Sequence, residues 1–364
     1  MSTNNNFQPN WISSPGETIS DILIERKITN KEFAKKMGCT AAFITKLLNG
    51  KYNITLEIAD KLAKSLGSSK AFWLKREAQY QEDIDRAEQK DKEKTEWLQC
   101  MPLSDMVKFG WINKTTKKAD KIKACLRFFD VTSVDEWYQA YNNLHMKVAF
   151  RTSASFDSTS ESVITWLRQG ELESNKIHCQ PWNKHRLSES IIQARALARI
   201  GDPEIFIPKL RSIFSECGVA LIIAPTPKGC RASGATYFTS PNKAILMLSL
   251  RYLSDDHFWF SLFHEAGHIL LHENTSLFLE DINNCNKQEE DEANNFSENI
   301  LIPNEHQEEF SSLRANQWRQ IIRFSKKLNL SPGTVVGQLQ FHGIIEHKQL
   351  NKLKTRFKWN HEII

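Results

Sequence analysis

The sequence predicts a mainly α-helical protein with a small α+β domain in its C-terminal part. Apolar residues recur at helical spacing over most of the chain, and two short β-branched runs follow residue 217. The length of 364 residues suits two or three domains, and 40% hydrophobic and 25% charged residues are typical of globular proteins. We expect a flexible tail over 1–10, a helical bundle over 11–80, a charged helical linker over 81–96, a helical connector or sensor region over 97–217 and the α+β domain over 218–364.

Residues 30–48 have the form of a helix-turn-helix. The apolar stripe of Phe33, Ala34 and Met37 predicts a first helix, Gly38 suits its end, and residues 40–48 predict a second helix. The second helix of such a motif lies in the major groove of DNA. The side chains expected to face DNA from the second helix and just beyond it are Thr40, Ala41, Thr45, Lys46, Asn49 and Lys51. We expect Lys35, Lys36 and Lys51 to lie near the phosphates.

Positive charge is concentrated in this N-terminal module. Residues 11–80 hold twelve Lys and Arg against seven Asp and Glu, an excess of five that equals the net charge of the whole chain. Local basicity indicates a polyanionic partner, and helix-turn-helix proteins usually bind paired half-sites as dimers. We therefore expect binding to double-stranded DNA by a homodimer. The alternative is a small helical bundle whose lysines are merely solvated.

Charges of both signs alternate over residues 81–96, which predicts a solvated linker helix. The segment 97–217 contains aromatic clusters at helical spacing but no pattern that indicates chemistry. Beyond it, the β-branched runs at 219–224 and 244–250 predict strands. The intervening segment is expected to be a loop because it contains Gly229, Gly234 and Pro241.

A strongly apolar helix with a metal-binding motif is predicted over residues 256–272. His264, Glu265 and His268 form the sequence H-E-x-x-H, and the residues around them are apolar on every face. Buried imidazoles and carboxylates are costly unless a partner satisfies them. Positions i and i+4 share one helix face, so His264 and His268 can hold one Zn²⁺ ion, while Glu265 reaches a water molecule beside it.

The acidic segment 288–303 is the expected source of a third metal ligand, which a catalytic zinc site requires. We predict Glu290 in this role, with Glu289 and Glu292 as alternatives. A chance occurrence of H-E-x-x-H is the competing interpretation, but the apolar helix and the acidic helix after it favour a metal site. Three nearby side chains are expected to have other roles: His272 in the core or beside the ligands, His257 exposed, and Tyr237 packed within a loop rather than stabilising an oxyanion.

Zinc at this position predicts metal-assisted hydrolysis of a peptide bond. Zinc lowers the pKa of water towards about 7 and polarises a carbonyl group. Glu265 would take the proton from water as general base and pass it to the leaving amine. The strand 244–250 directly precedes the metal helix, and we expect its edge to pair with an extended peptide.

The cysteine pattern and the N-terminus bear on the cellular compartment. The seven cysteines are scattered and never form C-x-x-C, which is typical of free thiols in a reducing compartment. The first ten residues lack the features of a signal peptide, and no apolar run of about 18 residues predicts a membrane span. We expect a cytoplasmic protein without a membrane partner.

Two parts of the chain resemble known families. The helix-turn-helix, together with Pro15 to Glu17 and Phe72 to Leu74, resembles the Xre-type, lambda-repressor-like module of HigA-like antitoxins. The C-terminal part resembles the ImmA/IrrE family of zinc metallopeptidases, although Ala266 stands where that family usually has Leu. The residues that carry this second resemblance are Gly234 to Thr236, Leu248 to Arg251, Phe258 to Phe260, Phe263 to His272, Glu290, Ala293, Asn294, Phe296, Leu301 to Pro303 and Ser331 to Gln340.

These resemblances imply a lambda-repressor-like helical bundle joined to a zincin-like metallopeptidase domain with a short β-sheet. They also imply a transcriptional regulator that cleaves a repressor-type protein in a stress, phage or toxin-antitoxin response. The rival hypothesis is a non-proteolytic HigA-like antitoxin or repressor, with a cognate toxin as partner, whose metal domain serves folding, sensing or partner binding. A third hypothesis is a structural site with His272 as fourth ligand. Glu265 favours the enzyme, because a purely structural site does not need it.

Overall fold

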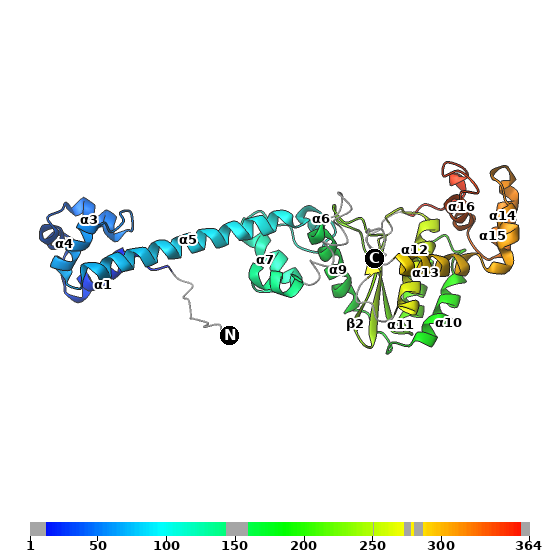
Figure 1. The fold of residues 1–364 in the computed structure, drawn as a ribbon, viewed down its shortest axis with the longest axis horizontal. Helices are drawn as coiled ribbons and strands as arrows, with labels where there is room; N and C mark the ends of the chain where they lie inside the picture. Colours follow the sequence, from blue (N-terminus) through cyan, green and yellow to red (C-terminus); the bar gives the residue numbers. More distant parts are fainter. Residues whose placement is uncertain (1–11, 143–158, 250, 273–277, 280–286, 358–364) are drawn as a thin grey trace. The chain divides into compact units, whose positions relative to one another are not determined.

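The computed structural model describes residues 12–142, 159–249, 251–272, 278–279 and 287–357, which belong to two compact units, Met1–Glu96 and Trp97–Ile364 (Figure 1). Most of these residues are helical, and a small sheet lies in the second unit, so the predicted fold class is confirmed. The expected tail and the last residue of the expected strand 244–250 lie outside the described residues. Across the described ranges, no helix is both long and apolar enough to cross a bilayer.

Unit 1 is a bundle of short helices that begin at polar caps. Its helices are α1 (Pro15–Glu25), α2 (Asn30–Met37), α3 (Ala41–Leu48), α4 (Leu56–Leu66) and the first part of α5 (Lys70–Cys100). Thr29, Thr40 and Thr55 precede α2, α3 and α4, and each hydroxyl accepts a hydrogen bond from a backbone N–H of the first turn. Gly38 ends α2 with a φ of 64°, a left-handed conformation that glycine adopts without strain.

The core of unit 1 fixes the two helices of the helix-turn-helix against their neighbours. Its buried side chains come from all five helices and the α3–α4 loop: Ile19, Leu23, Phe33, Ala34, Met37, Ile44, Leu47, Ile54, Ala59, Leu62, Leu66 and Trp73. These residues recur every three or four positions, which is the spacing of an apolar helix face. The opposite faces of α2 and α3 therefore remain available to solvent.

Helix α5 is one continuous helix of 31 residues, where the sequence predicted a separate linker helix over 81–96 after the helical bundle. No Gly or Pro interrupts residues 70–100, so nothing in the backbone ends the helix earlier. Its first turns belong to unit 1. Trp73 is fully buried and donates a hydrogen bond to the carbonyl oxygen of Gly67, and Glu77 accepts one from the backbone N–H of Ile54 at 3.0 Å.

A four-stranded sheet lies at the centre of unit 2. Its strands are β1 (Val219–Ile223), β2 (Gly234–Ser240), β3 (Lys243–Leu248) and β4 (Phe278–Leu279), in the spatial order β1-β3-β2-β4. Strand β3 runs parallel to β1 and antiparallel to β2, which also pairs with β4. The predicted strands β1 and β3 are confirmed, with small shifts at their ends.

Strand β2 corrects two expectations. The segment around Gly234 and Tyr237 was expected to be a loop, but it pairs with β3 from Gly234 opposite Leu248 to Ser240 opposite Lys243. The Thr, Tyr and Phe residues at its centre favour a strand, but the Gly and Ser at its two ends are typical of loops. Because β3 has neighbours on both sides, its edge is not available to an extended peptide, and that expectation was wrong.

Helices cover both faces of the sheet, so unit 2 has three layers (Figure 1). Alternate residues of β1 enter different cores: Val219, Leu221 and Ile223 face one, and Ala220 and Ile222 face the other. Burial on both faces explains why β1 is a continuous apolar run. The first core is shared with α10 (Lys184–Arg195), α11 (Pro203–Ser215), α12 (Asp255–Leu271), α13 (Lys287–Leu301), α14 (Gln307–Ser312), α15 (Trp318–Lys327) and α16 (Pro332–Phe341), and the second with α6 (Leu103–Lys108), α7 (Lys118–Phe129) and α9 (Ser160–Ser174).

Residues of both 97–217 and 218–364 thus contribute to the same two cores of unit 2. Strand β3 shows why they belong together, since Leu246 faces the core that contains α12 while Met247 packs with α9 on the other side. Three short 3-10 helices complete the described elements: η1 (Asn304–His306), η2 (Ala315–Gln317) and η3 (Asn351–Leu353).

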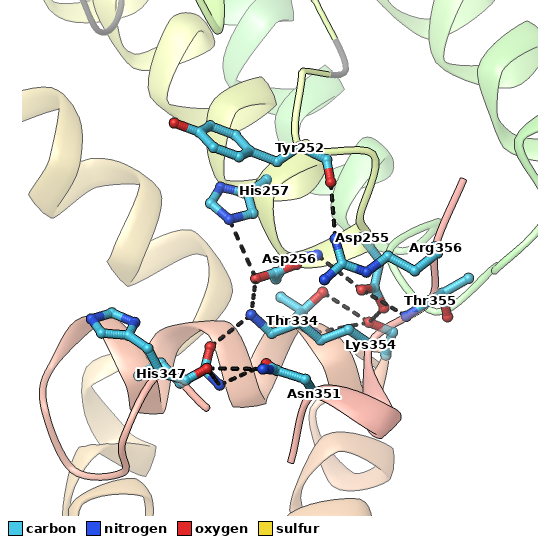
Figure 2. A network of polar contacts seen from close by, with 12 residues as sticks. Tyr252, Asp255, Asp256, His257, Thr334, His347, Asn351, Lys354, Thr355 and Arg356 are labelled. Atoms are coloured by element: carbon cyan, nitrogen blue, oxygen red, sulfur yellow. Dashed lines mark hydrogen bonds and ion pairs between the residues drawn. The ribbon is translucent and has the colours of Figure 1, made fainter. Parts of the chain in front are cut away.

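A buried polar network ties the C-terminal segment to the first turn of α12 (Figure 2). Lys354 Nζ lies 2.6 Å from Asp256 Oδ2, with side chains only 8% and 6% exposed. Asp255 accepts hydrogen bonds from Ser331 Oγ at 2.6 Å and from the backbone N–H of Thr355 at 3.0 Å. Burial is the largest single influence on Asp256 and opposes its ionisation, but the hydrogen bond from Lys354 and the other polar and charged groups around the carboxyl together outweigh it and lower its pKa.

We predict that Lys354→Met lowers the free energy of unfolding by about 3 kcal/mol, because it leaves the charge of Asp256 buried without its cation. The matched control is Lys327→Met, which removes an ion pair with Glu309 of the same length, 2.6 Å, between side chains 53% and 47% exposed. The control should cost less than about 1 kcal/mol. Urea unfolding of both variants measures the difference, and equal losses would contradict a structural role for the buried pair.

Candidate metal centre

Helix α12 buries three titratable side chains inside an apolar helix. His264, Glu265 and His268 are 2%, 0% and 1% exposed. They lie among buried apolar neighbours on the same helix, including Trp259, Phe263 and Ala266 on the side of the first core. Such groups persist in a core only when hydrogen bonds, charges or a metal ion satisfy them.

Small side chains allow α13 to approach α12 closely. Ala293 and Ser297 of α13 are fully buried, and Ser297 Oγ donates a hydrogen bond of 2.9 Å to the carbonyl oxygen of Phe260. On α12, a Cβ atom at Gly267 would lie only 3.0 Å from the ring of Phe296. Glu290 lies one turn before Asn294 on the same face of α13. The close contact between the helices brings Glu290 to the two histidines.

The side chains of His264, His268 and Glu290 converge on one point, whereas Glu289 and Glu292 do not join this group. The two Nε2 atoms are 3.0 Å apart, and Glu290 oxygens lie 3.3 Å from His264 Nε2 and 3.5 Å from His268 Nε2. Ligands about 2.0–2.1 Å from a tetrahedral zinc ion lie about 3.3 Å from each other. The two imidazole nitrogens and the Glu290 carboxylate, which approaches them with different oxygens, therefore have separations close to those of ligands around one zinc ion.

The protonation states of the cluster also suit a divalent cation. Burial opposes ionisation of Glu290, but hydrogen bonds with His264 and His268 outweigh it and hold its pKa well below the usual range. Burial lowers the pKa of His268, and the neighbouring His264 lowers it further, although Glu290 acts in the opposite direction. A neutral imidazole and an ionised carboxylate are the forms that bind metals.

Asn294 orients His264 and was not assigned a role from the sequence. Its Oδ1 lies 3.0 Å from His264 Nδ1, so it can accept the Nδ1–H hydrogen bond and leave the Nε2 lone pair directed at the cluster. The available signal was its spacing, since Asn294 lies four residues after Glu290 on the same helix face.

Glu265 lies outside the ligand group and packs against the start of β2. A Cβ atom at Gly234 would overlap the carboxylate of Glu265, so only glycine at this position leaves room for that side chain. Strand β2, which the sequence did not predict, therefore helps to place the expected general base.

The remaining residues singled out near the motif have other contacts. His272 Nε2 lies 3.2 Å from the carbonyl oxygen of Glu289, away from the three converging donors. His257 is exposed and its ring stacks on Tyr252. The hydroxyl of Tyr237 donates a hydrogen bond to the carbonyl oxygen of Leu167 at 3.1 Å, and burial raises the pKa of Tyr237 well above its usual value.

In unit 1, all eight side chains expected to contact DNA are exposed: Lys35, Lys36, Thr40, Ala41, Thr45, Lys46, Asn49 and Lys51. The hydroxyl of Thr45 donates a hydrogen bond to the carbonyl oxygen of Ala41 at 3.0 Å. Lys46 Nζ lies 5.7 Å from the ring centroid of Tyr52. The faces of α2 and α3 that carry these residues are thus open to solvent.

We predict that Asn294→Ala weakens zinc affinity by about 10- to 100-fold, because His264 loses the partner that fixes its ring. The neighbouring Asn295 is exposed and lies outside the cluster, so Asn295→Ala is the matched control and should retain the affinity. Competition with a chelator of known zinc affinity measures both. Equal affinities in the two variants would contradict the orienting role of Asn294.

Known proteins match the two ends of the chain separately. Residues 19–73 match a family model described as helix-turn-helix, and residues 222–339 match the Peptidase_M78 model, described as IrrE N-terminal-like domain. The uncharacterized HTH-type transcriptional regulator YddM of Escherichia coli K12 is 38% identical over 60 residues, which are 16% of this chain and 64% of that protein. The chain therefore spans less than two thirds of this curated relative.

A solved structure from Nostoc punctiforme, described as an antidote protein of a plasmid maintenance system, is 34% identical and matches 24% of this chain and 93% of that one, with a TM-score of 0.21. The two family matches include the exposed faces of α2 and α3 and the cluster of His264, His268 and Glu290. The chain thus joins a helix-turn-helix domain of a transcriptional-regulator type to a domain of the IrrE N-terminal-like family.

Proposed function

We propose that this protein is a DNA-binding transcriptional regulator whose second unit is a zinc-dependent endopeptidase that cleaves a repressor-type protein. The observation that supports it most directly is the convergence of His264, His268 and Glu290 beside the buried carboxylate of Glu265. Three protein ligands are typical of catalytic zinc, whereas structural zinc sites use four. Cytoplasmic location and a homodimer are parts of the same proposal.

The residues of the cluster divide the chemical work. His264, His268 and Glu290 would hold the zinc ion, which when bound polarises the scissile carbonyl and makes water more acidic. Glu265 takes a proton from the attacking water molecule while the oxygen of that water bonds to the carbonyl carbon. The C–N bond then breaks, and Glu265 returns the proton to the leaving amine. Gly234 keeps the space that this carboxylate needs.

Unit 1 would bind DNA and so determine the sites at which the regulator acts. The exposed Thr45 and Lys46 are the proposed base contacts, and Lys35, Lys36 and Lys51 the proposed phosphate contacts. The basic excess of residues 11–80 supports a polyanionic ligand. A repressor-type protein is the proposed substrate, and the rival partner, a cognate toxin, would be bound without being cut.

We predict that Glu265→Gln abolishes cleavage and retains zinc, because the amide cannot accept the proton while all three ligands remain. The same exchange at the exposed Glu308 is the matched control and should leave both properties unchanged. Metal analysis and incubation with candidate repressor proteins provide the two measurements. Cleavage by Glu265→Gln at the wild-type rate would refute the proposed role, and zinc-loaded wild-type protein that cuts none of them would favour the toxin-binding alternative.

We predict that DNA affinity falls steeply with salt and that Lys36→Ala reduces the slope of log K against log salt by about 1, because one phosphate contact is lost. Lys61→Ala is the control, since Lys61 is paired with Glu57 at 2.8 Å on α4. The slope measured for Lys61→Ala should equal that of the wild type. Fluorescence anisotropy with a labelled duplex at several salt concentrations gives the slopes; an unaltered slope in Lys36→Ala would count against the proposed interface.

A further inference from the structure

The helical part of unit 2 carries a concentration of positive charge that the proposed function does not use. Residues 106–129, which include all of α7, hold seven Lys and Arg residues against one acid, Asp120. This excess of six is larger than the net charge of +5 of the whole chain, and local basicity indicates an anionic partner. Six of the seven cations are exposed, namely Lys108, Lys114, Lys117, Lys118, Lys123 and Arg127.

A cavity of about 450 Å³ lies beside these charges, between α7, the loop that precedes it and α9. Sites for small molecules typically have volumes of about 300–1,000 Å³. Five residues of α7 line the cavity at the spacing of a single helix face: Asp120, Lys123, Ala124, Arg127 and Phe128. The cavity therefore has one wall that is both cationic and continuous.

The other walls of the cavity are largely apolar, and their central residue is Trp111. Its ring is half-buried and nearly parallel to that of Phe128, with centroids 6.3 Å apart and an interplanar angle of 12°. The backbone N–H groups of Trp111 and Ile112 both donate to the carbonyl oxygen of Met106, at 2.8 and 3.3 Å, which holds the loop against α6. Leu172 of α9 also lines the cavity. A planar ring of a ligand would find a fixed aromatic surface here.

Lys123 and Arg127 lie four residues apart on the wall formed by α7. Both are exposed, and in the described ranges no carboxylate pairs with either of them. Like charges at this spacing repel each other on a helix, so an anion bound between them relieves an unfavourable interaction. A guanidinium group donates two parallel hydrogen bonds to a phosphate, which makes Arg127 suited to that anion.

The charges and the apolar walls together define the ligand. Two cations match the double charge of a phosphate monoester better than the single charge of a carboxylate. The carboxylate of Asp120, one turn before Lys123, accepts hydrogen bonds from hydroxyl groups such as those of ribose. Duplex DNA also presents phosphates, but contacts to its backbone do not require an apolar cavity behind the cations. The cavity thus favours a small phosphate ester with a planar ring.

We propose that this cavity binds a purine nucleoside monophosphate, with the base against Trp111 and the phosphate between Lys123 and Arg127. Asp120 accepts hydrogen bonds from the ribose hydroxyls. The site lies within residues 97–217, where the sequence predicted a connector or sensor region, and it adds a small-molecule ligand to the proposed regulator. It does not depend on the peptidase chemistry.

The test is isothermal titration calorimetry of the full-length protein at physiological salt. The probes are AMP and GMP, with adenosine and guanosine as ligands that lack the phosphate and inorganic phosphate as the ligand that lacks the ring. At least one nucleotide should bind about tenfold more tightly, or more, than its nucleoside and than inorganic phosphate, because only the nucleotide makes both sets of contacts.

Arg127→Gln and Lys123→Gln should each weaken nucleotide binding about tenfold, because each removes a charged hydrogen-bond donor to the phosphate. Lys118→Gln is the matched control, since Lys118 is exposed on the same helix but does not line the cavity. Lys36→Ala is the control for the basic surface of unit 1. Both controls should retain the wild-type affinity.

Trp111→Ala should weaken the nucleotide about tenfold through the loss of stacking, and Trp111→Phe should restore most of the affinity because it keeps a ring. Rescue by Phe separates lost stacking from lost folding. Equal loss of affinity in Trp111→Phe and Trp111→Ala would contradict stacking on this ring.

Three results would overturn the proposed site: no binding of either nucleotide, binding no tighter than that of inorganic phosphate, or wild-type affinity in Arg127→Gln. Duplex DNA is the rival ligand for the same cations. Fluorescence anisotropy with a labelled duplex should give Arg127→Gln the wild-type DNA affinity. A loss of DNA affinity in Arg127→Gln, without nucleotide binding by the wild type, would instead identify these cations as a DNA contact and refute the proposal.

Discussion

The close contact between α12 and α13 is the constraint on which the metal centre depends. Each helix contributes only part of the site, so the donor atoms meet only where the two axes approach closely. Gly267, Ala293 and Ser297 make that approach possible because they occupy little space. The same contact removes two imidazoles and a carboxylate from water, and they tolerate burial only because they satisfy one another or share a cation.

The sheet packs against α12 through β2 and β3 and also takes part in the site. Both faces of β1 and β3 are covered, and β3 has no free edge because it lies between β1 and β2. Strand β2 begins at Gly234, where the absence of a side chain leaves room for Glu265. The expected general base thus lies on the same helix as the two histidines, and the start of a strand leaves room for its carboxylate. A shift of β2 towards α12 would close the space that this carboxylate occupies.

Local signals explain which parts of this architecture were predictable. Threonine caps and glycine stops mark the helices of unit 1, and the H-E-x-x-H spacing indicates a metal site on α12. The strand β2 was missed because Gly234 and Pro241 border its short run of strand-favouring Thr, Tyr and Phe residues. The partners Asn294 and Lys354 were not assigned roles. The spacing of Asn294 from Glu290 does not by itself indicate a hydrogen bond with His264, and Lys354 is distant from Asp256 in the sequence.

The attachment of residues 354–356 to the start of α12 makes the metal helix sensitive to a cut far from it in the sequence. Lys354 pairs with Asp256, the backbone N–H of Thr355 donates to Asp255, and Arg356 donates to the carbonyl oxygen of Tyr252. Proteolysis between α16 and Lys354 would free this segment and leave the charge of Asp256 buried without its ammonium partner. The helix that carries His264 and His268 would then lose its anchorage at the first turn, so a nick at a distant point would loosen the candidate metal centre.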